Sequence, residues 1–356
     1  MKKKVLLMGA SGSGKTSMRS LIFSNNPASL TARLGATIDV EQNHVRFLGD
    51  LILNLWDCGG QDAFMDSYLS TQQSTIFSHV GVLIYVFEVE SRNMSKDLAY
   101  YTECLDALNK YSPEASVFLL VHKMDLVRGS KGAILEKKTK ELRQASGEMS
   151  MTVFGTSIYD ETLYKAWSRI VHTLIPNASV LSKHLTTLAD ACGATEVVLF
   201  ERTTFLVIAT SSPPPISTPP APIEPPAATA LSPSTSSSSS TPSTIGFTQS
   251  SNQKEDGDDH DSDLTGDIHK LDTTRYERTS ELIKAFKHSC ARAREEFYAL
   301  EMELDDFTAV LDELTKNTYV LIVVHNPTIE TAAVRMNIRL ARKKFEELQG
   351  DSLISQ

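Results

Sequence analysis

The residues whose types and spacing most clearly indicate a chemical function lie near the start of the chain. There, Gly9–Thr16 fits the pattern G-x-x-x-x-G-K-[ST]. The apolar run Val5–Met8 precedes this motif and predicts a buried strand, and residues 17–23 predict the opening of a helix. A glycine-rich turn between a strand and a helix N-terminus directs backbone N–H groups and the positive end of the helix dipole toward an anion. The motif therefore predicts a phosphate-binding loop, with Lys15 on the β- and γ-phosphates of a nucleotide and the Thr16 hydroxyl on Mg²⁺.

A second segment also contains residues that could take part in chemistry. It is Asp57–Gln61, with the sequence D-C-G-G-Q, and it follows the apolar run Leu51–Trp56. A carboxylate at the end of a strand is suited to the magnesium shell of a bound nucleotide, which assigns Asp57 to the metal. Gly60 has no side chain, so its backbone N–H can approach a γ-phosphate. Gln61 follows it and is placed to orient an attacking water.

A third segment, residues 122–125 with the sequence H-K-M-D, follows the predicted strand Val117–Val121. The carboxylate of Asp125 can accept two hydrogen bonds from the N1–H and the exocyclic amine of guanine, whereas adenine lacks this donor pair. The alkyl stem of Lys123 can lie across the plane of the base. Residues 156–158, after a further predicted strand, offer backbone N–H groups to the guanine carbonyl. Together these segments indicate GTP rather than ATP.

The loop Arg33–Val40 lies between the first two segments and contains a threonine hydroxyl that could complete the magnesium shell. Such a loop would become ordered with GTP and relax after hydrolysis. Thr37 is the candidate, and Thr31 is the competing one.

These motifs need elements that bring them together. Strand-like runs, including Leu51–Trp56, Val82–Phe87 and Val117–Val121, alternate with the helical patterns Asp97–Leu108 and Glu161–Leu174. This alternation predicts an α/β domain with a mainly parallel sheet and helices on both faces. Ligands of such sheets bind beyond the carboxyl ends of the strands, where all three motifs fall.

A second domain follows, with the order helix, two strands, insertion, helix, strands, helix. Its predicted hairpins are 197–201 with 204–209 and 307–311 with 319–324, and the pattern of 279–304 predicts one long helix. The apolar face of its last helix contains Ile338, Ala341, Phe345 and Leu348. We predict a nucleotide-binding domain at 1–178, an α+β domain at 179–210 plus 272–350, and an insertion at 211–271.

The insertion is unlike the rest of the chain in composition. Ten of the fourteen prolines lie between Pro213 and Pro242, the nearly pure serine run Ser234–Thr241 lies within the same stretch, and an acidic patch lies at 255–263. Such a segment has too little apolar surface to offset the entropy of ordering, so we predict that it is disordered.

Composition excludes several functions. Acidic residues number 44 and basic residues 35, giving a net charge of −9, which disfavours nucleic acid as a partner. The four cysteines are scattered without a C-x-x-C spacing, which suits a reducing compartment. No apolar run reaches the length of a membrane span, so no direct membrane insertion is expected and the location is expected to be cytoplasmic.

The three segments carry a family resemblance. The stretch Arg33–Asp62, with A-T-I-D-V and L-W-D-C-G-G-Q, and V-H-K-M-D-L at Val121–Leu126 closely resemble the Rag/Gtr small GTPases, and the A/B (Gtr-one-like) type rather than the C/D type. The resemblance covers about residues 3–210 and resumes near Arg275. His122 strengthens it, because most small GTPases have asparagine there.

The resemblance implies a P-loop G domain followed by a roadblock-type domain, with GTP or GDP and Mg²⁺ as cofactors. It implies that Gln61 is the hydrolytic residue and that Thr16, Thr37 and Asp57 bind the metal. The nucleotide-binding residues would be Ser11, Gly12, Ser13, Gly14, Lys15, Thr16, Ser17, Thr37, Gly60, His122, Lys123, Asp125, Ser157 and Ile158.

The resemblance also implies partners. The second domain would pair with a C/D-type Rag/Gtr GTPase, and a lipid-anchored scaffold complex would recruit the heterodimer to the lysosomal or vacuolar surface. Its GTP state would report amino-acid sufficiency to the TOR kinase complex, and a GTPase-activating complex would accelerate hydrolysis.

Two features depart from the family pattern. The insertion is much longer than the short loop expected there, and a histidine at 122 cannot copy both the donor and the acceptor of an asparagine amide. Three functions stay open at this point: a regulated GTP switch, a nucleotide-binding scaffold without turnover, and a P-loop kinase or ATPase. Gln61 argues against the scaffold and Asp125 against an adenine nucleotide.

Overall fold

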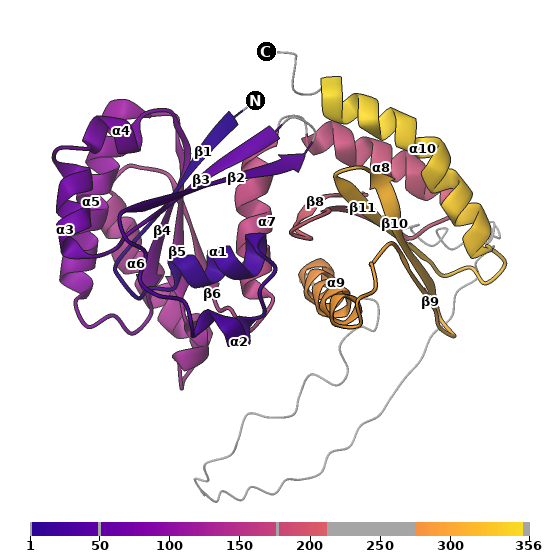
Figure 1. Cartoon of the computed structure of the whole chain (residues 1–356), viewed down its shortest axis with the longest axis horizontal. Helices are drawn as coiled ribbons and strands as arrows, with labels where there is room; N and C mark the ends of the chain where they lie inside the picture. Colours follow the sequence, from indigo (N-terminus) through magenta and orange to yellow (C-terminus); the bar gives the residue numbers. More distant parts are fainter. Residues whose placement is uncertain (1, 49–50, 176–177, 212–274, 352–356) are drawn as a thin grey trace, which may run out of the picture. The chain divides into compact units, whose positions relative to one another are not determined.

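A six-stranded sheet forms the first half of the computed structural model, which describes residues 2–48, 51–175, 178–211 and 275–351 (Figure 1). Its strand order is β2-β3-β1-β4-β5-β6, and only the β2–β3 pair is antiparallel. The strands are β1 (Lys2–Met8), β2 (Val40–Leu48), β3 (Leu51–Cys58), β4 (Val80–Glu88), β5 (Ser116–His122) and β6 (Met151–Thr156). The predicted mainly parallel sheet is confirmed.

Helices cover both faces of this sheet because its central strands are apolar on both sides. In β1, Val5 and Leu7 belong to the apolar cluster that contains α1 and α7, whereas Leu6 and Met8 belong to the one that contains α3, α4 and α5. The helices are α1 (Lys15–Phe23), α2 (Ala28–Thr31), α3 (Asp62–Leu69), α4 (Gln73–Phe77), α5 (Met94–Tyr111), α6 (Lys131–Ser146) and α7 (Thr162–Leu174).

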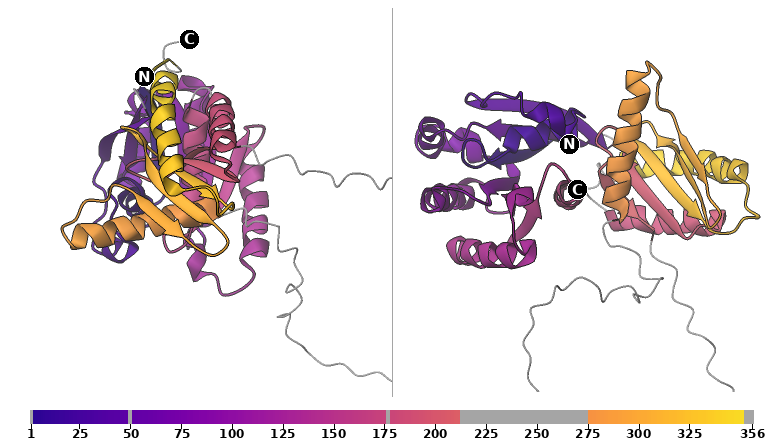
Figure 2. Two further views of the ribbon diagram at one scale, coloured as in Figure 1. Left: turned by 90° about the vertical axis from the view of Figure 1, so that its right-hand side faces the viewer. Right: turned by 90° about the horizontal axis from the view of Figure 1, so that it is seen from below.

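A second sheet is antiparallel, with the order β8-β7-β11-β10-β9. Its strands are β7 (Glu196–Glu201), β8 (Val207–Thr210), β9 (Leu300–Glu303), β10 (Thr308–Thr315) and β11 (Thr318–Val324). Helices α8 (Ala178–Cys192) and α10 (Thr331–Asp351) pack on one face and α9 (Arg275–Arg292) on the other (Figure 2). Alternate residues of β7 point to opposite faces of this sheet. Val197 and Leu199 pack in the cluster that contains α8 and α10. Val198 and Phe200 pack in the cluster that contains α9.

The prediction of one long helix over 279–304 is wrong in its second half. Helix α9 ends at Arg292, and Arg294 adopts a left-handed backbone with φ 61° that a helix cannot continue through. Residues 300–303 form β9, in which Leu300 and Met302 alternate with glutamates and pair with β10. The period-2 pattern of this short strand is masked by the helical pattern before it. Strand β2 and helix α6 also have no counterpart in the sequence-based prediction.

Both sheets contribute to one hydrophobic cluster, which extends from Val5 and Leu53 in the first sheet to Leu199 and Val320 in the second. A polar contact accompanies it. The Nζ of the buried Lys284 in α9 donates hydrogen bonds to the carbonyl oxygens of Leu21 and Ile22, at 3.0 and 2.9 Å, near the end of α1. All of these residues belong to one compact unit.

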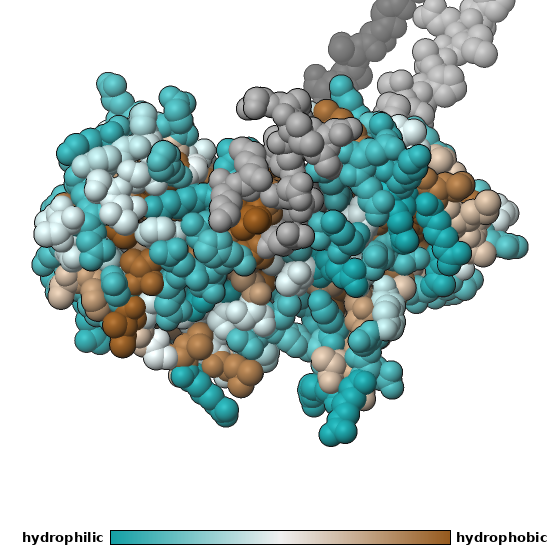
Figure 3. All heavy atoms as spheres, turned by 45° about the horizontal axis from the view of Figure 1, so that its top comes forward, coloured by the Kyte–Doolittle hydropathy of each residue, from teal (hydrophilic) through white to brown (hydrophobic). Residues whose placement is uncertain are grey.

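The predicted insertion at 211–271 lies outside the described residues, apart from Ser211. Within the described ranges, no helix is both long and apolar enough to cross a membrane. The face seen in Figure 3 is mainly hydrophilic, with hydrophobic residues in separate small groups.

Candidate nucleotide-binding site

The loop between β1 and α1 has the geometry that its glycines predict. Gly14 adopts a left-handed backbone with φ 99° and lies immediately before the first residue of α1. A Cβ atom at this position would lie 2.6 Å from Cδ2 of His122, so only glycine fits. The Oγ of the fully buried Ser13 has no hydrogen-bond partner among the described residues. The loop therefore presents donors to a ligand at the N-terminus of a helix.

A cavity of about 220 Å³ joins three of the predicted segments. It is lined by Ser11, Gly12, Gly14, Lys15, Thr16, Leu34, Gly35, Ala36, Thr37, Gly60 and Gln61. Lys15 is only 5 % exposed, and its Nζ donates to the carbonyl oxygens of Gly9 and Ala10 at 2.7 and 2.8 Å. Burial lowers the pKa of Lys15 to about 8, while the nearby Asp57 carboxylate opposes this shift. A buried ammonium at such a cavity suits an anionic ligand.

The residues assigned to the metal also lie together. The hydroxyl oxygens of Thr16 and Thr37 are 2.5 Å apart. Asp57 is fully buried; its Oδ2 accepts a hydrogen bond from Nε of Arg19 at 3.0 Å, and its Oδ1 has no partner in the part of the chain that the structure describes. Burial raises the pKa of Asp57, and the Arg19 guanidinium lowers it. Two hydroxyls and an uncommitted carboxylate oxygen are the hard donors that Mg²⁺ prefers, so these residues fit that ion.

Two further observations bear on this candidate metal site. Thr31 donates its hydroxyl to the Ala28 carbonyl at 2.7 Å within α2 and does not line the cavity, so the structure places Thr37 there and not Thr31. No group of three His, Cys, Asp or Glu side chains that could hold a metal occurs among the described residues. A magnesium ion at this place would therefore need hydroxyl and phosphate oxygens as well as Asp57.

Gly60 and Gln61 lie against the phosphate-binding loop. The carbonyl oxygen of Gly60 accepts a hydrogen bond from the backbone N–H of Ser11 at 2.9 Å, and a Cβ on Gly60 would lie 2.4 Å from the Gly9 oxygen. Gln61 precedes the first residue of α3, and its Oε1 is buried without a hydrogen-bond partner within the described ranges. The side-chain amide is thus available to a ligand or a water at the cavity.

His122 contacts the phosphate-binding loop. Its Nδ1 lies 2.9 Å from Oγ1 of Thr156, while the opposite edge of the ring packs on Gly14. Burial lowers the pKa of His122 to about 4, so the ring is neutral at pH 7. The histidine therefore ties the end of β5 to the loop and to β6, which accounts for its packing without any need to imitate an asparagine amide.

Of the other residues assigned to the base, Lys123 and Asp125 follow β5 and Ser157 follows β6, and these two strands are neighbours in the sheet. Asp125 is exposed, and its Oδ1 accepts a hydrogen bond from Oγ of Ser157 at 2.6 Å. Lys123 has a left-handed backbone, and its Nζ pairs with Oε1 of Glu88 at 2.9 Å. None of these side chains lines the 220 Å³ cavity.

The expectation that Ser157 offers its backbone N–H to a guanine carbonyl stays a prediction, and the structure shows another partner for this group. That N–H donates to the Thr162 hydroxyl at 3.0 Å, because the turn into α7 brings Thr162 beneath it. Ser157 instead orients Asp125 through its hydroxyl, and Ile158 is the remaining candidate for the backbone donor.

Sequence reasoning missed several side-chain contacts that hold the site. Thr156 fixes His122, Glu88 holds Lys123, and Arg19 contacts Asp57. Arg19 could have been found, because a residue three positions after Thr16 lies on the same side of a helix. The other two belong to neighbouring strands, and only the pairing of those strands brings them close.

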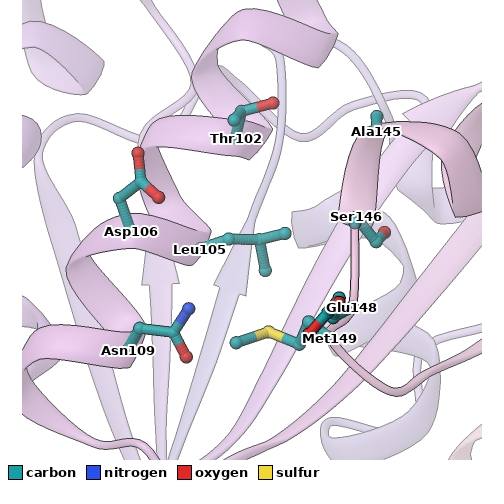
Figure 4. Close-up of a pocket in the computed structure, with 9 residues that line it drawn as sticks. Thr102, Leu105, Asp106, Asn109, Ala145, Ser146, Glu148 and Met149 are labelled. Carbon is teal, nitrogen blue, oxygen red and sulfur yellow. The ribbon is translucent and has the colours of Figure 1, made fainter.

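A larger cavity of about 450 Å³ lies elsewhere, between α5 and the end of α6. Leu105 and Met149 extend between the two helices, and none of the predicted site residues lines this cavity (Figure 4). It lacks a basic side chain that could bind phosphate.

The phosphate-binding loop, the carboxylate and glutamine after β3, and the H-K-M-D segment after β5 define a G protein. A family model described as "Gtr1/RagA G protein conserved region" matches residues 4–221, and the chain belongs to this family. It is 44% identical to Ras-related GTP-binding protein A of Dictyostelium discoideum over 98% of both chains. It is 45% identical to GTP-binding protein gtr1 of Schizosaccharomyces pombe over 97% of this chain and 96% of that one.

The type within the family is also clear. Ras-related GTP-binding protein C of Homo sapiens is only 26% identical, over 60% of this chain and 54% of that protein. The predicted resemblance to the A/B type is confirmed.

Proposed function

We propose that this chain binds GTP and hydrolyses it slowly, as a switch whose nucleotide state is read by partner proteins. The observation that carries the proposal is the convergence of Lys15, Thr16, Thr37 and Gln61 on one cavity, with Asp57 buried among them. Relatives named as GTP-binding proteins support it.

In this proposal, the N–H groups of the loop and the Lys15 ammonium bind the β- and γ-phosphates. Thr16, Thr37 and Asp57 would hold Mg²⁺, which supplies positive charge against the developing charge on the phosphates. Gln61 orients the attacking water from the edge of the cavity, where its oxygen is uncommitted among the described residues. Asp125, oriented by Ser157, accepts hydrogen bonds from guanine.

Hydrolysis is expected to be slow in the chain alone. Arg19, the arginine that contacts Asp57, also pairs with Glu41 and is therefore already engaged by two carboxylates. A catalytic group from an activating complex is expected to accelerate hydrolysis by about 10³–10⁵-fold.

The test is the nucleotide content of the purified protein, followed by single-turnover hydrolysis of GTP and ATP. GDP or GTP should co-purify, and Gln61→Leu should abolish the accelerated reaction while GTP binding persists. Tight ATP binding with weak GTP binding would revive the kinase or ATPase. Nucleotide binding with no hydrolysis, even with an activating complex, would favour the scaffold.

We also propose that the second domain is of the roadblock type and pairs with a C/D-type Rag/Gtr GTPase. Strand β9 is an edge strand, with β10 as its only neighbour in the described sheet. Helix α9 exposes Leu282 and Phe286, one turn apart and 58 and 45 % accessible. An edge strand and an exposed apolar helix face each suit association with a similar domain.

Co-expression with a C/D-type chain tests this pairing. The two chains should co-purify at equal amounts, and Leu282→Asp with Phe286→Asp should release the partner while nucleotide binding is retained. Retention of the partner by this double variant would place the interface elsewhere.

The remaining assignments rest on the family resemblance. We propose that a lipid-anchored scaffold complex recruits the heterodimer to the lysosomal or vacuolar surface, where its GTP state signals amino-acid sufficiency to the TOR kinase complex. Imaging the tagged chain during amino-acid withdrawal, with and without the scaffold, tests both the location and the signal.

A further inference from the structure

Two carboxylates face each other beside the metal residues. Glu41 of β2 and Asp57 of β3 are directly opposite partners in the antiparallel pair. Like charges at such positions repel and destabilise the pairing of strands. Burial of Asp57 strengthens the repulsion, because water cannot screen a charge inside the protein.

Arg19 of α1 bridges the two. Its Nε donates to Oδ2 of Asp57 at 3.0 Å and its Nη2 to Oε2 of Glu41 at 2.7 Å. The Arg19 side chain is only 15 % exposed, and Glu41 is 47 % exposed. The guanidinium offers several donors in a fixed plane, which suits one side chain that must hold two acids.

The bridge has a consequence for Asp57. One carboxylate oxygen is committed to Arg19, which fixes the plane of the carboxylate, and the other has no partner among the residues described. The bridge also joins the metal residues to β2, the strand that follows the loop of Thr37. We propose that Arg19 is a positioning residue of the magnesium site, which cancels the charge of Glu41 and fixes Asp57 with one oxygen left for the metal shell.

This inference rests on the proposed function, since it assumes that Asp57 serves a magnesium ion. A purely structural ion pair is the competing explanation, and it predicts a change in stability without a change in the Mg²⁺ requirement. A measurement of the Mg²⁺ requirement therefore distinguishes the two explanations.

The experiment uses the full chain with its heterodimer partner, loaded with fluorescent GDP. The rate of GDP release is measured against buffered free Mg²⁺, with release in excess EDTA as the metal-independent reference. Arg19→Gln is expected to raise the Mg²⁺ concentration for half-maximal retention by about tenfold, the lower end of what residues that orient metal ligands contribute. Release in EDTA should stay within about twofold of the wild type.

Companion variants isolate the charge of Glu41. Glu41→Gln alone should shift the Mg²⁺ requirement little, because Arg19 keeps its hydrogen bond to Asp57. The double variant R19Q/E41Q should lie closer to the wild type than R19Q does, because the facing charge is gone. Arg143→Gln, at an exposed arginine of α6, removes the same charge away from the site and should behave as the wild type.

The result that overturns the inference is an unchanged Mg²⁺ requirement in folded R19Q. If R19Q does not fold, Arg19→Lys is the deciding variant, because it keeps the charge but loses the planar pair of donors. A raised Mg²⁺ requirement in this variant supports the inference, and an unchanged Mg²⁺ requirement overturns it. A wild-type protein that retains GDP equally with and without Mg²⁺ would instead overturn the metal site of the proposed function, which is a distinguishable outcome.

Discussion

The two ends of the proposed nucleotide site are built differently. At the phosphate end, Lys15 and Asp57 are buried and held by hydrogen bonds. At the base end, Asp125 is exposed and is oriented by Ser157. A buried charge is costly to leave unpaired, whereas an exposed one can return to water. The phosphate end is therefore expected to determine affinity for any nucleoside triphosphate, and the base end to determine selectivity.

The largest expected effect is at the phosphate end. Lys15→Met keeps the length of the side chain but cannot donate to phosphate oxygens. The affinity for GTP should fall at least about 100-fold, because charge-assisted hydrogen bonds contribute about 1.5–3 kcal/mol each. Titration with fluorescent GTP and ATP measures it. Both affinities should fall by a similar factor, and a change in the preference for guanine would contradict the division of roles.

At the base end, Asp125→Asn is expected to alter selectivity. The amide replaces one acceptor with a donor, which suits xanthine because its ring has a carbonyl where guanine has an amine. The affinity for GTP should fall by about 10–100-fold, and XTP should then bind more tightly than GTP. Competition binding with the two nucleotides measures the change. If the affinities for GTP and XTP fell by the same factor, Asp125 would have no contact with the base.

His122 joins the two ends, and its contribution depends on pH. Its folded pKa of about 4 lies below the value near 6.5 of an unfolded chain. The stability from the neutral ring is therefore complete above about pH 6.5 and is lost as pH falls toward 4, by up to about 1.4 kcal/mol per pH unit. Urea unfolding at pH 7 and 5.5 should show a smaller pH dependence in His122→Asn. Equal slopes in both proteins would contradict the burial of a neutral histidine.

The smallest effect is expected at Ser157. Ser157→Ala removes the hydroxyl that orients Asp125 but leaves the carboxylate exposed to water. The affinity for GDP should fall only about fivefold, in line with about 1 kcal/mol for one hydrogen bond. Dissociation rates of fluorescent GDP are the measurement. A loss as large as that of Lys15→Met would show that both ends contribute equally to affinity.

Local sequence was enough to predict the phosphate-binding loop, because a strand, a glycine turn and a helix are adjacent in the chain. It could not separate Thr37 from Thr31, since the difference lies in a short helix that uses the Thr31 hydroxyl for itself. Nor could it find the Arg19 bridge, because Asp57 and Glu41 lie 38 and 22 residues away and meet only through the register of β2 with β3.

The error over 279–304 has a different physical origin. A four-residue strand such as β9 has too few positions to establish its own periodicity, and it exists because β10 offers it hydrogen bonds. Tertiary pairing therefore overrode the local helical preference.

The hydrophobic cluster shared by the two sheets, with Lys284 hydrogen-bonded to α1, predicts that the two sheets unfold as a single cooperative unit. Heat should then melt both sheets in one transition. A bound nucleotide would then raise the free energy of unfolding of both sheets together. The increase is about 4 kcal/mol when the nucleotide concentration is a thousand times its dissociation constant. On the proposed function, a bound nucleotide would therefore also stabilise the edge strand β9, which lies far along the chain from the phosphate-binding loop.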